Sequence, residues 1–265
     1  MTELLQFQDL LALLSGVAVG FSLGLIGGGG SILAVPLLIY VVGVTDTHIA
    51  IGTSAAAVAA SAFANLVAHA RARTVKWPCA LFFAVFGIVG AALGSTLGKL
   101  TDGDVLLALF GVAMVVVGAA MLRRRACGDD PDVRMTRETL RRLGPRLAAG
   151  GLAVGGLSGF FGIGGGFLVV PGLVVATAMP MLNAVGSSLV SVTAFGTTTA
   201  VNYALDGLVD LHLFADFVVG GVAGGIAGTL LARRMGPQGT LKTVFSVVVM
   251  LVGVYVAVRG VLTLI

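Results

Sequence analysis

The chain has 265 residues, of which 57% are hydrophobic and only 11% are charged. Because soluble domains carry about 25% charged residues, this composition excludes an ordinary water-soluble fold and predicts an all-α integral membrane protein. The net charge of +4 does not indicate nucleic-acid binding, since the basic residues lie in loops between apolar segments.

Ten continuously apolar segments predict helices rather than the alternating strands of a β-barrel. In chain order they cover residues 9–26, 31–44, 48–70, 77–98, 103–122, 147–162, 167–180, 184–204, 212–232 and 241–264. A crossing helix needs roughly 20 residues, so the second segment of each set of five is short for a full span. The N-terminal region contains Glu3 and Asp9 and no Lys or Arg, which favours a retained membrane helix over a signal peptide.

The two sets of five segments are related by an internal repeat. Residues 24–36 recur as residues 159–171 at an offset of 135, and residues 50–54 recur as residues 184–188 at an offset of 134. Matches in the same order indicate a duplication. We therefore predict a first transmembrane repeat over residues 1–122, a basic cytoplasmic linker over residues 123–146, and a second transmembrane repeat over residues 147–265.

Loop charges predict that the two repeats have opposite orientations. Arg71, Arg73 and Lys76 lie between the third and fourth segments, whereas the matching loop of the second repeat carries Asp206 and Asp210. Since basic loops stay in the cytoplasm, an odd number of crossings per half gives an inverted repeat with both termini outside. Ten spans, or six spans plus two re-entrant hairpins, satisfy this pattern equally. The expected location is a bacterial inner (cell) membrane, with multiple passes.

A glycine run precedes the short second segment of each repeat. Transporters with inverted repeats hold substrate near the midplane, between broken helices whose N-termini face it. Glycine allows close backbone approach, and a helix N-terminus attracts an anion. The predicted binding residues are Gly28, Gly29, Gly30, Ser31, Gly164, Gly165 and Gly166. The alternative is that these glycines serve helix packing alone, which is the role expected for Gly90, Gly94, Gly98, Gly220, Gly224 and Gly228 inside long helices.

Polar residues of the third segment of each repeat form a second set of candidates. Thr53, Ser54, Ser187 and Ser188 occupy matched positions and are predicted to contribute to the binding site, although membrane hydroxyls also bond to their own helix. The residues considered for coupling to H⁺ or Na⁺ are His69, Asn65, Asn202 and Asp216. An interfacial histidine and a hydrated carboxylate are the alternatives for His69 and Asp216.

The sequence contains no recognisable catalytic or metal-binding motif. Neither glycine run is followed by the Gly-Lys-Ser/Thr of a nucleotide-binding loop. The segment Gly156-Leu157-Ser158-Gly159-Phe160 comes close to the Gly-x-Ser-x-Gly motif of hydrolases. Phe160, however, stands where that motif has its last glycine. We therefore expect no enzyme activity, no cofactor and no metal.

The two glycine motifs carry a resemblance to a known family. Gly24-xx-Gly27-x-Gly29-Gly30 with Pro36, and Gly159-xx-Gly162-x-Gly164-Gly165 with Pro171, resemble the sulfite exporter TauE/SafE family of membrane permeases. Gly52-Thr53-Ser54, Gly186-Ser187-Ser188 and Val75-Lys76-Trp77 are also similar to the family pattern. The resemblance implies export or uptake of small sulfur-containing anions such as sulfite, sulfonates or sulfoacetate.

These patterns favour a secondary or facilitative anion transporter that works by alternating access without ATP. An anion channel and a non-transport membrane subunit or sensor are the alternatives. The expected partners are the lipid bilayer, a small anionic substrate and a coupling ion, and the chain is compatible with a homo-oligomer.

Overall fold

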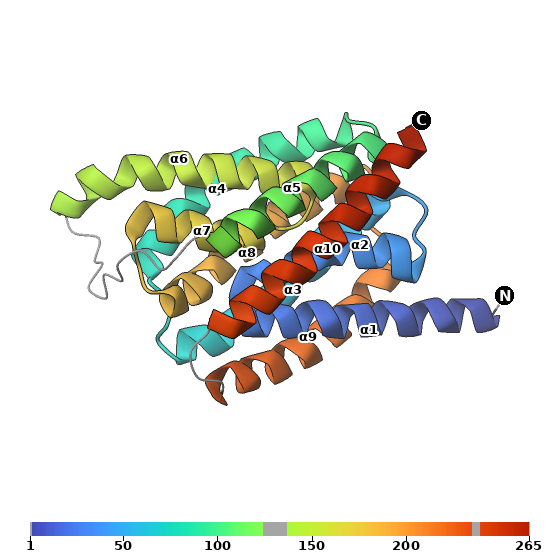
Figure 1. Ribbon diagram of the computed structural model, residues 1–265, viewed down its shortest axis with the longest axis horizontal. Coiled ribbons are helices and arrows are strands. Elements are labelled where there is room, and N and C mark those ends of the chain that lie inside the picture. Colours follow the sequence, from blue (N-terminus) through green and yellow to red (C-terminus); the bar gives the residue numbers. More distant parts are fainter. Residues whose placement is uncertain (1, 124–136, 235–238, 265) are drawn as a thin grey trace.

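The computed structural model describes residues 2–123, 137–234 and 239–264, and within these ranges the chain contains helices and no strand. The first half comprises α1 (Thr2–Ile26), a 3₁₀ segment η1 (Gly27–Leu33), α2 (Ala34–Leu37), a π-helical segment η2 (Leu38–Val42), α3 (Thr47–Arg71), α4 (Trp77–Lys99) and α5 (Gly103–Arg123). The second half comprises α6 (Arg137–Phe161), α7 (Gly166–Thr177), α8 (Met181–Ala204), α9 (Leu211–Arg234) and α10 (Gly239–Leu264). Figure 1 shows these helices arranged as one bundle.

The ten segments expected from the sequence are all helical in the structure, with two clear differences in extent. Helix α1 begins at Thr2, well before the predicted start at residue 9. Helix α6 begins at Arg137, ten residues before the predicted start at residue 147 and inside the predicted linker. Leu143 in this extension and Leu147 directly after it pack against the apolar core. Their spacing places them on one face of a helix, so the charged linker residues continue an amphipathic helix beyond the apolar segment.

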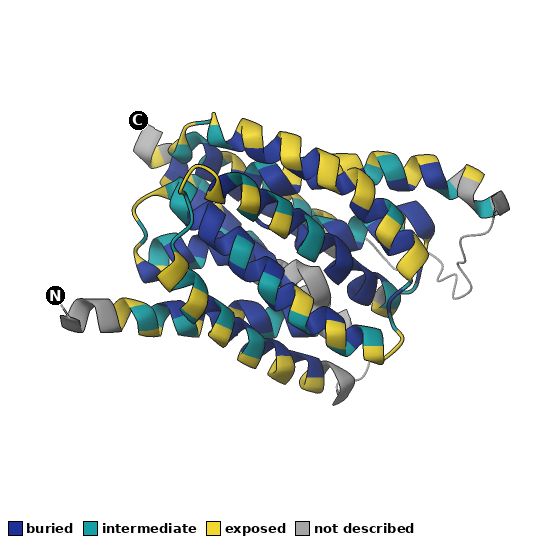
Figure 2. Ribbon diagram, turned by 180° about the vertical axis from the view of Figure 1, so that it is seen from behind, coloured by how far each residue is buried: buried dark blue, intermediate teal, exposed yellow. Residues whose placement is uncertain are grey.

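The lengths and surfaces of the helices fit a membrane protein. Six helices in the described residues are long and apolar enough to cross a bilayer, namely α1, α3, α4, α5, α8 and α9. Large apolar side chains such as Leu93 and Leu251 are exposed on the outside of the bundle (Figure 2), as a lipid-facing surface requires. Helix α7 has only 12 residues, or about 18 Å of length, and is too short to cross alone.

Two helix crossings are built from glycine. Helix α1 packs on α9 and α4 packs on α6. A Cβ atom on Gly20 would overlap the carbonyl oxygen of Gly221, and one on Gly155 would overlap that of Gly87. Small residues let membrane helices approach until their backbones touch. The glycines predicted to serve helix packing make the same close backbone contacts, so that prediction is confirmed. They are Gly90, Gly94, Gly98, Gly220, Gly224 and Gly228. Gly24 and Gly159, the first glycines of the family motif, also lie in these crossings.

Helices α3 and α8 form the centre of the bundle. They pack against each other and carry the most buried of the apolar spans, at 72% and 67% of the residues in each. Helix α5 packs against α10. The segments η1 and α7, which hold the two glycine runs, contact each other, and both contact α8. The fold therefore brings the two glycine runs together beside the most buried helices.

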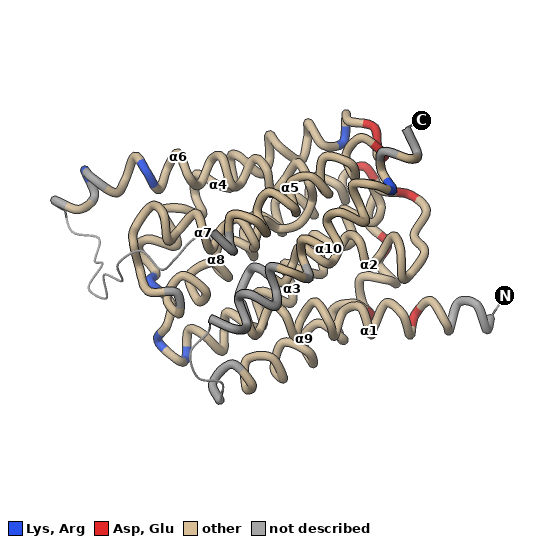
Figure 3. Tube along the Cα trace, viewed as in Figure 1, with Lys and Arg blue, Asp and Glu red and all other residues tan. Residues whose placement is uncertain are grey.

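The charged residues lie at the two ends of the bundle. Most of the Lys and Arg drawn lie where α6 begins and where α3 turns into α4, whereas the acidic residues drawn lie at the opposite end, where α1 begins and α10 ends (Figure 3). A few basic residues share the acidic end, among them Lys99, which pairs with Asp206. Carboxylates at the acidic end also cap helices, since Asp46 accepts hydrogen bonds from the backbone of α3 and Asp210 from that of α9. The bundle thus has one basic end, one acidic end and an apolar middle.

Candidate functional site

The second glycine run forms a tight turn in front of α7. Gly162, Gly164 and Gly165 all have positive φ angles, of 66°, 65° and 69°. This left-handed conformation is easily adopted only by glycine. Gly165 is the N-cap of α7, and no side chain caps the helix. The sequence prediction that a helix starts near Phe167 is confirmed to within one residue.

This turn leaves two backbone donors unused in the interior. Within the described part of the chain, the N–H groups of Gly164 and Gly165 have no backbone acceptor. Both residues are buried, as are Gly166 and Phe167 at the start of α7. Unpaired N–H groups inside a protein cost free energy, and at the start of a helix they also carry partial positive charge. The arrangement is therefore suited to an anion.

One buried hydroxyl lies against these donors. A Cβ atom on Gly165 would lie 2.5 Å from the hydroxyl oxygen of Ser158, which is therefore in direct contact with the turn. The Ser158 side chain is 0% exposed and its hydroxyl has no hydrogen-bond partner in the described residues. A buried hydroxyl normally finds a partner. Sequence reasoning considered Ser158 only for a hydrolase motif and missed this position, because the contact depends on the α6–α7 turn.

Apolar side chains enclose the remaining sides of the turn. A Cβ on Gly164 would lie 3.1 Å from Val58 of α3 and 3.5 Å from Val192 of α8. The Phe195 ring of α8 approaches Gly165. Residues 161–167 are all buried. The donors thus lie in an apolar, enclosed environment, where an electrostatic attraction is stronger than in water.

The first glycine run has a different local structure. Gly28, Gly29, Gly30 and Ser31 are wound into the 3₁₀ segment η1, and α2 begins only at Ala34. The sequence predicts instead a helix that starts near Ser31. Consecutive 3₁₀ turns use N–H groups in i→i+3 bonds, so this run is less open as a donor site. Gly30 and Ser31 are fully buried, and Gly30 packs on the backbone of Ser22 and Leu23 in α1.

The paired hydroxyl positions of α3 and α8 bind backbone groups of the other half. The Thr53 hydroxyl accepts a hydrogen bond of 2.9 Å from the backbone N–H of Asp210, just before α9. The Ser187 hydroxyl accepts one of 2.9 Å from the N–H of Lys76, just before α4. Each bond joins a central helix to the start of a helix from the other half. A substrate role for these two residues stays a prediction, and their observed role is to fix helix starts.

Ser54 and Ser188 bond mainly to their own helices. Ser54 donates to the carbonyl of Ile51 at 2.9 Å, and a second acceptor, Gly162, lies at 3.4 Å. Ser188 donates to the carbonyl of Val185 at 2.7 Å. This is the back-bonding expected as the alternative for membrane hydroxyls. The contact with Gly162 nevertheless places Ser54 at the edge of the glycine turn.

The residues considered for coupling are not gathered at the turn. Asn65 donates to the carbonyl of Ser61 at 3.0 Å and accepts from Thr229 at 3.3 Å, which links α3 to α9. His69 lies at the end of α3, with its Nδ1 3.0 Å from the Thr74 hydroxyl. Both residues are buried.

Asn202 belongs to a polar network at the acidic end. Lys99 forms an ion pair with Asp206 and donates to both oxygens of Asn202, at 2.9 and 3.0 Å. The Asn202 amide donates in turn to Ser95 at 2.6 Å. The network joins α4 to α8. Asp216, the last coupling candidate, lies on α9 beside α1, away from the glycine turn.

Known proteins resemble this chain over most of its length. Residues 12–256 match the family model described as sulfite exporter TauE/SafE. A "probable membrane transporter protein" of Xylella fastidiosa (strain 9a5c) is 52% identical over 247 residues, covering 93% of this chain and 94% of that protein. The "probable membrane transporter protein YunE" of Bacillus subtilis is 26% identical, covering 93% of this chain and 96% of that protein.

A relative that matches over a shorter stretch is the "probable membrane transporter protein MJ0441" of Methanocaldococcus jannaschii, which is 29% identical over 194 residues and covers 70% of each chain. No solved structure matches the chain. The family match spans nearly all of the described helices, and the relatives named as transporters align with most of the chain. The chain therefore belongs to the sulfite exporter TauE/SafE family of membrane transport proteins.

Proposed function

We propose that this protein is a secondary or facilitative transporter of small sulfur-containing anions, the class of sulfite, sulfonates and sulfoacetate. The observation that carries the proposal is the pair of buried N–H donors of the glycine turn in front of α7, beside the hydroxyl of Ser158, none of which has a partner among the described residues. A sulfur oxyanion presents several acceptor oxygens on one centre and satisfies such a group without a buried Lys or Arg. The description of the family supports the same substrate class.

Alternating access is the mechanism that we propose. The donors at the glycine turn are buried, so a substrate reaches them only after helices move. Transporters with broken helices at the midplane expose one site to each side in turn. An anion bound at the turn replaces the missing hydrogen-bond acceptors and thereby stabilises the closed arrangement.

We further propose that residues 1–122 and 147–265 form an inverted repeat. The two glycine crossings support it, because they use equivalent residues. Gly20 contacts Gly221 in the α1–α9 crossing, and Gly155 contacts Gly87 in the α4–α6 crossing. Gly155 is the repeat counterpart of Gly20 at the offset of 135, and Gly221 is that of Gly87 at the offset of 134. The paired bonds of Thr53 and Ser187 support it in the same way. With the basic end in the cytoplasm, as the distribution of Lys and Arg favours, both termini lie outside.

Single cysteines test this orientation. In a background without Cys79 and Cys127, we expect an impermeant maleimide added to intact cells to label Leu205→Cys and not Ala72→Cys. Leu205 is 80% exposed in the α8–α9 turn, and Ala72 is exposed in the α3–α4 turn at the basic end. Permeabilised cells provide the control, because both positions react there. Labelling of Ala72→Cys alone from outside contradicts the proposed orientation.

Replacing Ser158 by alanine tests the anion site. Hydrogen bonds to charged groups contribute about 1.5–3 kcal/mol, so we expect KM for sulfite in proteoliposomes to rise roughly ten- to a hundredfold. Ser61→Ala is the matched control, since Ser61 is also a buried serine without a partner in the described residues, but it packs on Gly221 of α9. We expect this variant to keep the wild-type KM.

The same assay separates the competing functions. Saturable flux that depends on imposed ion gradients supports a carrier, whereas unitary currents support an anion channel. An unchanged KM in folded Ser158→Ala protein contradicts the site. Absence of flux for sulfite and for a panel of sulfonates, in folded wild-type protein, contradicts the proposed substrate class.

A further inference from the structure

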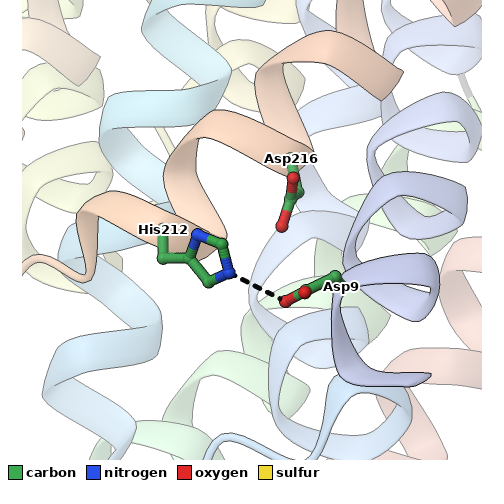
Figure 4. Close-up of side chains that lie close together, drawn as sticks. All are labelled: Asp9, His212 and Asp216. Carbon is green, nitrogen blue, oxygen red and sulfur yellow. Dashed lines mark ion pairs between the residues drawn. The ribbon is translucent and has the colours of Figure 1, made fainter. Parts of the chain in front are cut away.

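A group of three potential metal ligands lies between α1 and α9 at the acidic end of the bundle. Asp9 comes from α1, and His212 and Asp216 come from α9. One ligand atom from each residue can be chosen so that all three lie within 4.8 Å of one another. Figure 4 shows the three side chains directed toward a common point between the two helices.

Local geometry explains how these residues meet. His212 and Asp216 are four residues apart, so they occupy the same face of α9. Helix α1 is held against that face by the glycine crossing, in which Gly16 touches the backbone of Phe217. The His212 Nε2 atom lies 3.2 Å from an Asp9 carboxylate oxygen. Two helices thus supply the ligands, and the crossing sets the distance between them.

The Asp216 carboxylate has one oxygen, Oδ2, that is buried without a hydrogen-bond donor among the described residues. A buried carboxylate oxygen without a donor or cation is costly. Since the Asp9 carboxylate is also nearby, the site holds two acidic groups and one imidazole. A cation placed between the three side chains neutralises both carboxylates.

Helix packing does not require these three residues. At the repeat offsets of 134 and 135, their counterparts in the α4–α6 crossing are Pro78, Phe82 and Gly144. That crossing is built on the same glycine contacts without any ligand side chain. The three polar residues are therefore an addition to one crossing, at the end of the bundle where Asp and Glu gather (Figure 3).

We propose that Asp9, His212 and Asp216 bind a divalent transition-metal ion of the zinc class. One imidazole nitrogen and two carboxylate oxygens are ligands that Zn²⁺ accepts, with bonds of about 2.0–2.2 Å and a fourth position for water. Mg²⁺ and Ca²⁺ prefer oxygen ligands alone, so the histidine selects against them. The metal joins α1 to α9. The sequence analysis expected no metal site, because Asp9 lies about 200 residues from the other two ligands.

Zinc titration of the purified full-length protein tests the site. We expect ZnCl₂, and neither MgCl₂ nor CaCl₂, to raise the melting temperature, because a ligand that binds the folded state stabilises it. His212→Ala and Asp216→Asn are expected to weaken zinc binding by at least about tenfold in calorimetric titration. The His212 side chain is 70% exposed, so its replacement is compatible with folding.

A matched variant excludes binding at other groups. His48→Ala removes a histidine near the acidic end that is not among the three ligands, and it is expected to keep the wild-type zinc response. The proposal is overturned if His212→Ala binds zinc as tightly as the wild type does. It is also overturned if Mg²⁺ and Ca²⁺ produce the same thermal shift as Zn²⁺. Anion flux is not used as a readout, so this test is independent of the proposed function.

Discussion

Replacing Gly165 by alanine is expected to abolish saturable anion flux while leaving a membrane-inserted protein. The φ angle of +69° at Gly165 costs an L-residue roughly 1–2 kcal/mol. In addition, the new Cβ atom would lie 2.5 Å from both side-chain atoms of Ser158. Either the turn or Ser158 must then move, which changes the position of the donors relative to the Ser158 hydroxyl. Flux in proteoliposomes measures the loss, and size-exclusion chromatography checks the fold.

Gly207→Ala is the control that separates backbone strain from the lost site. Gly207 has a similar φ angle of +72°, but a Cβ atom there meets nothing within 4 Å. We expect this variant to lose a similar small amount of stability and to transport normally. Normal flux in Gly165→Ala contradicts a binding role for the turn. Equal loss of flux in both variants indicates that general destabilisation is responsible.

The sequence was sufficient to predict the helices, because the length of each apolar segment and the glycines between segments are local features. The bounds of α3, α4 and α5 differ from prediction by at most one residue at each end. The regular spacing of the glycines inside α4 and α9 also distinguished these packing residues from the two glycine runs. The start of α6 was missed, because a charged amphipathic extension does not look like a membrane segment.

Side-chain roles were harder to predict, because they depend on residues far away in the chain. Thr53 and Ser187 look like site residues at matched positions, but their hydroxyls bind backbone groups 157 and 111 residues away. Nothing in the local sequence specifies such partners. Conversely, Ser158 has no equivalent hydroxyl in the first repeat, where Leu23 occupies the position at the offset of 135.

The two glycine runs show how a small sequence difference changes local structure. Ile163 interrupts the second run, and the three glycines around it take left-handed conformations that form the turn. The first run has Gly28 at the matching position and winds into a 3₁₀ segment. A left-handed glycine turn in front of a helix therefore occurs in the second half and not in the first glycine run among the described residues. The binding site that we propose is asymmetric in this way and suits a substrate with one anionic end and one dissimilar end.

Alanine at Gly155 is expected to disrupt the α4–α6 crossing and to lower the free energy of unfolding by at least about 3 kcal/mol, the upper end of the range for overpacking. Its Cβ atom would overlap the Gly87 carbonyl oxygen and lie 2.6 Å from the Gly87 Cα atom. Backbone atoms cannot rotate away as a side chain can, so the helices must separate. Reversible unfolding in detergent measures the change.

The neighbouring Gly156 provides the matched control on the same helix. A Cβ atom there would have its nearest neighbour, the Gly90 carbonyl oxygen, at 3.8 Å. Because alanine is favoured over glycine in a helix by about 1 kcal/mol, Gly156→Ala is expected to be neutral or slightly stabilising. Equal stability of the two variants contradicts a crossing held by backbone contact. A loss confined to Gly155→Ala identifies backbone contact in the α4–α6 crossing, rather than the glycine content of α6, as a source of stability between the two halves.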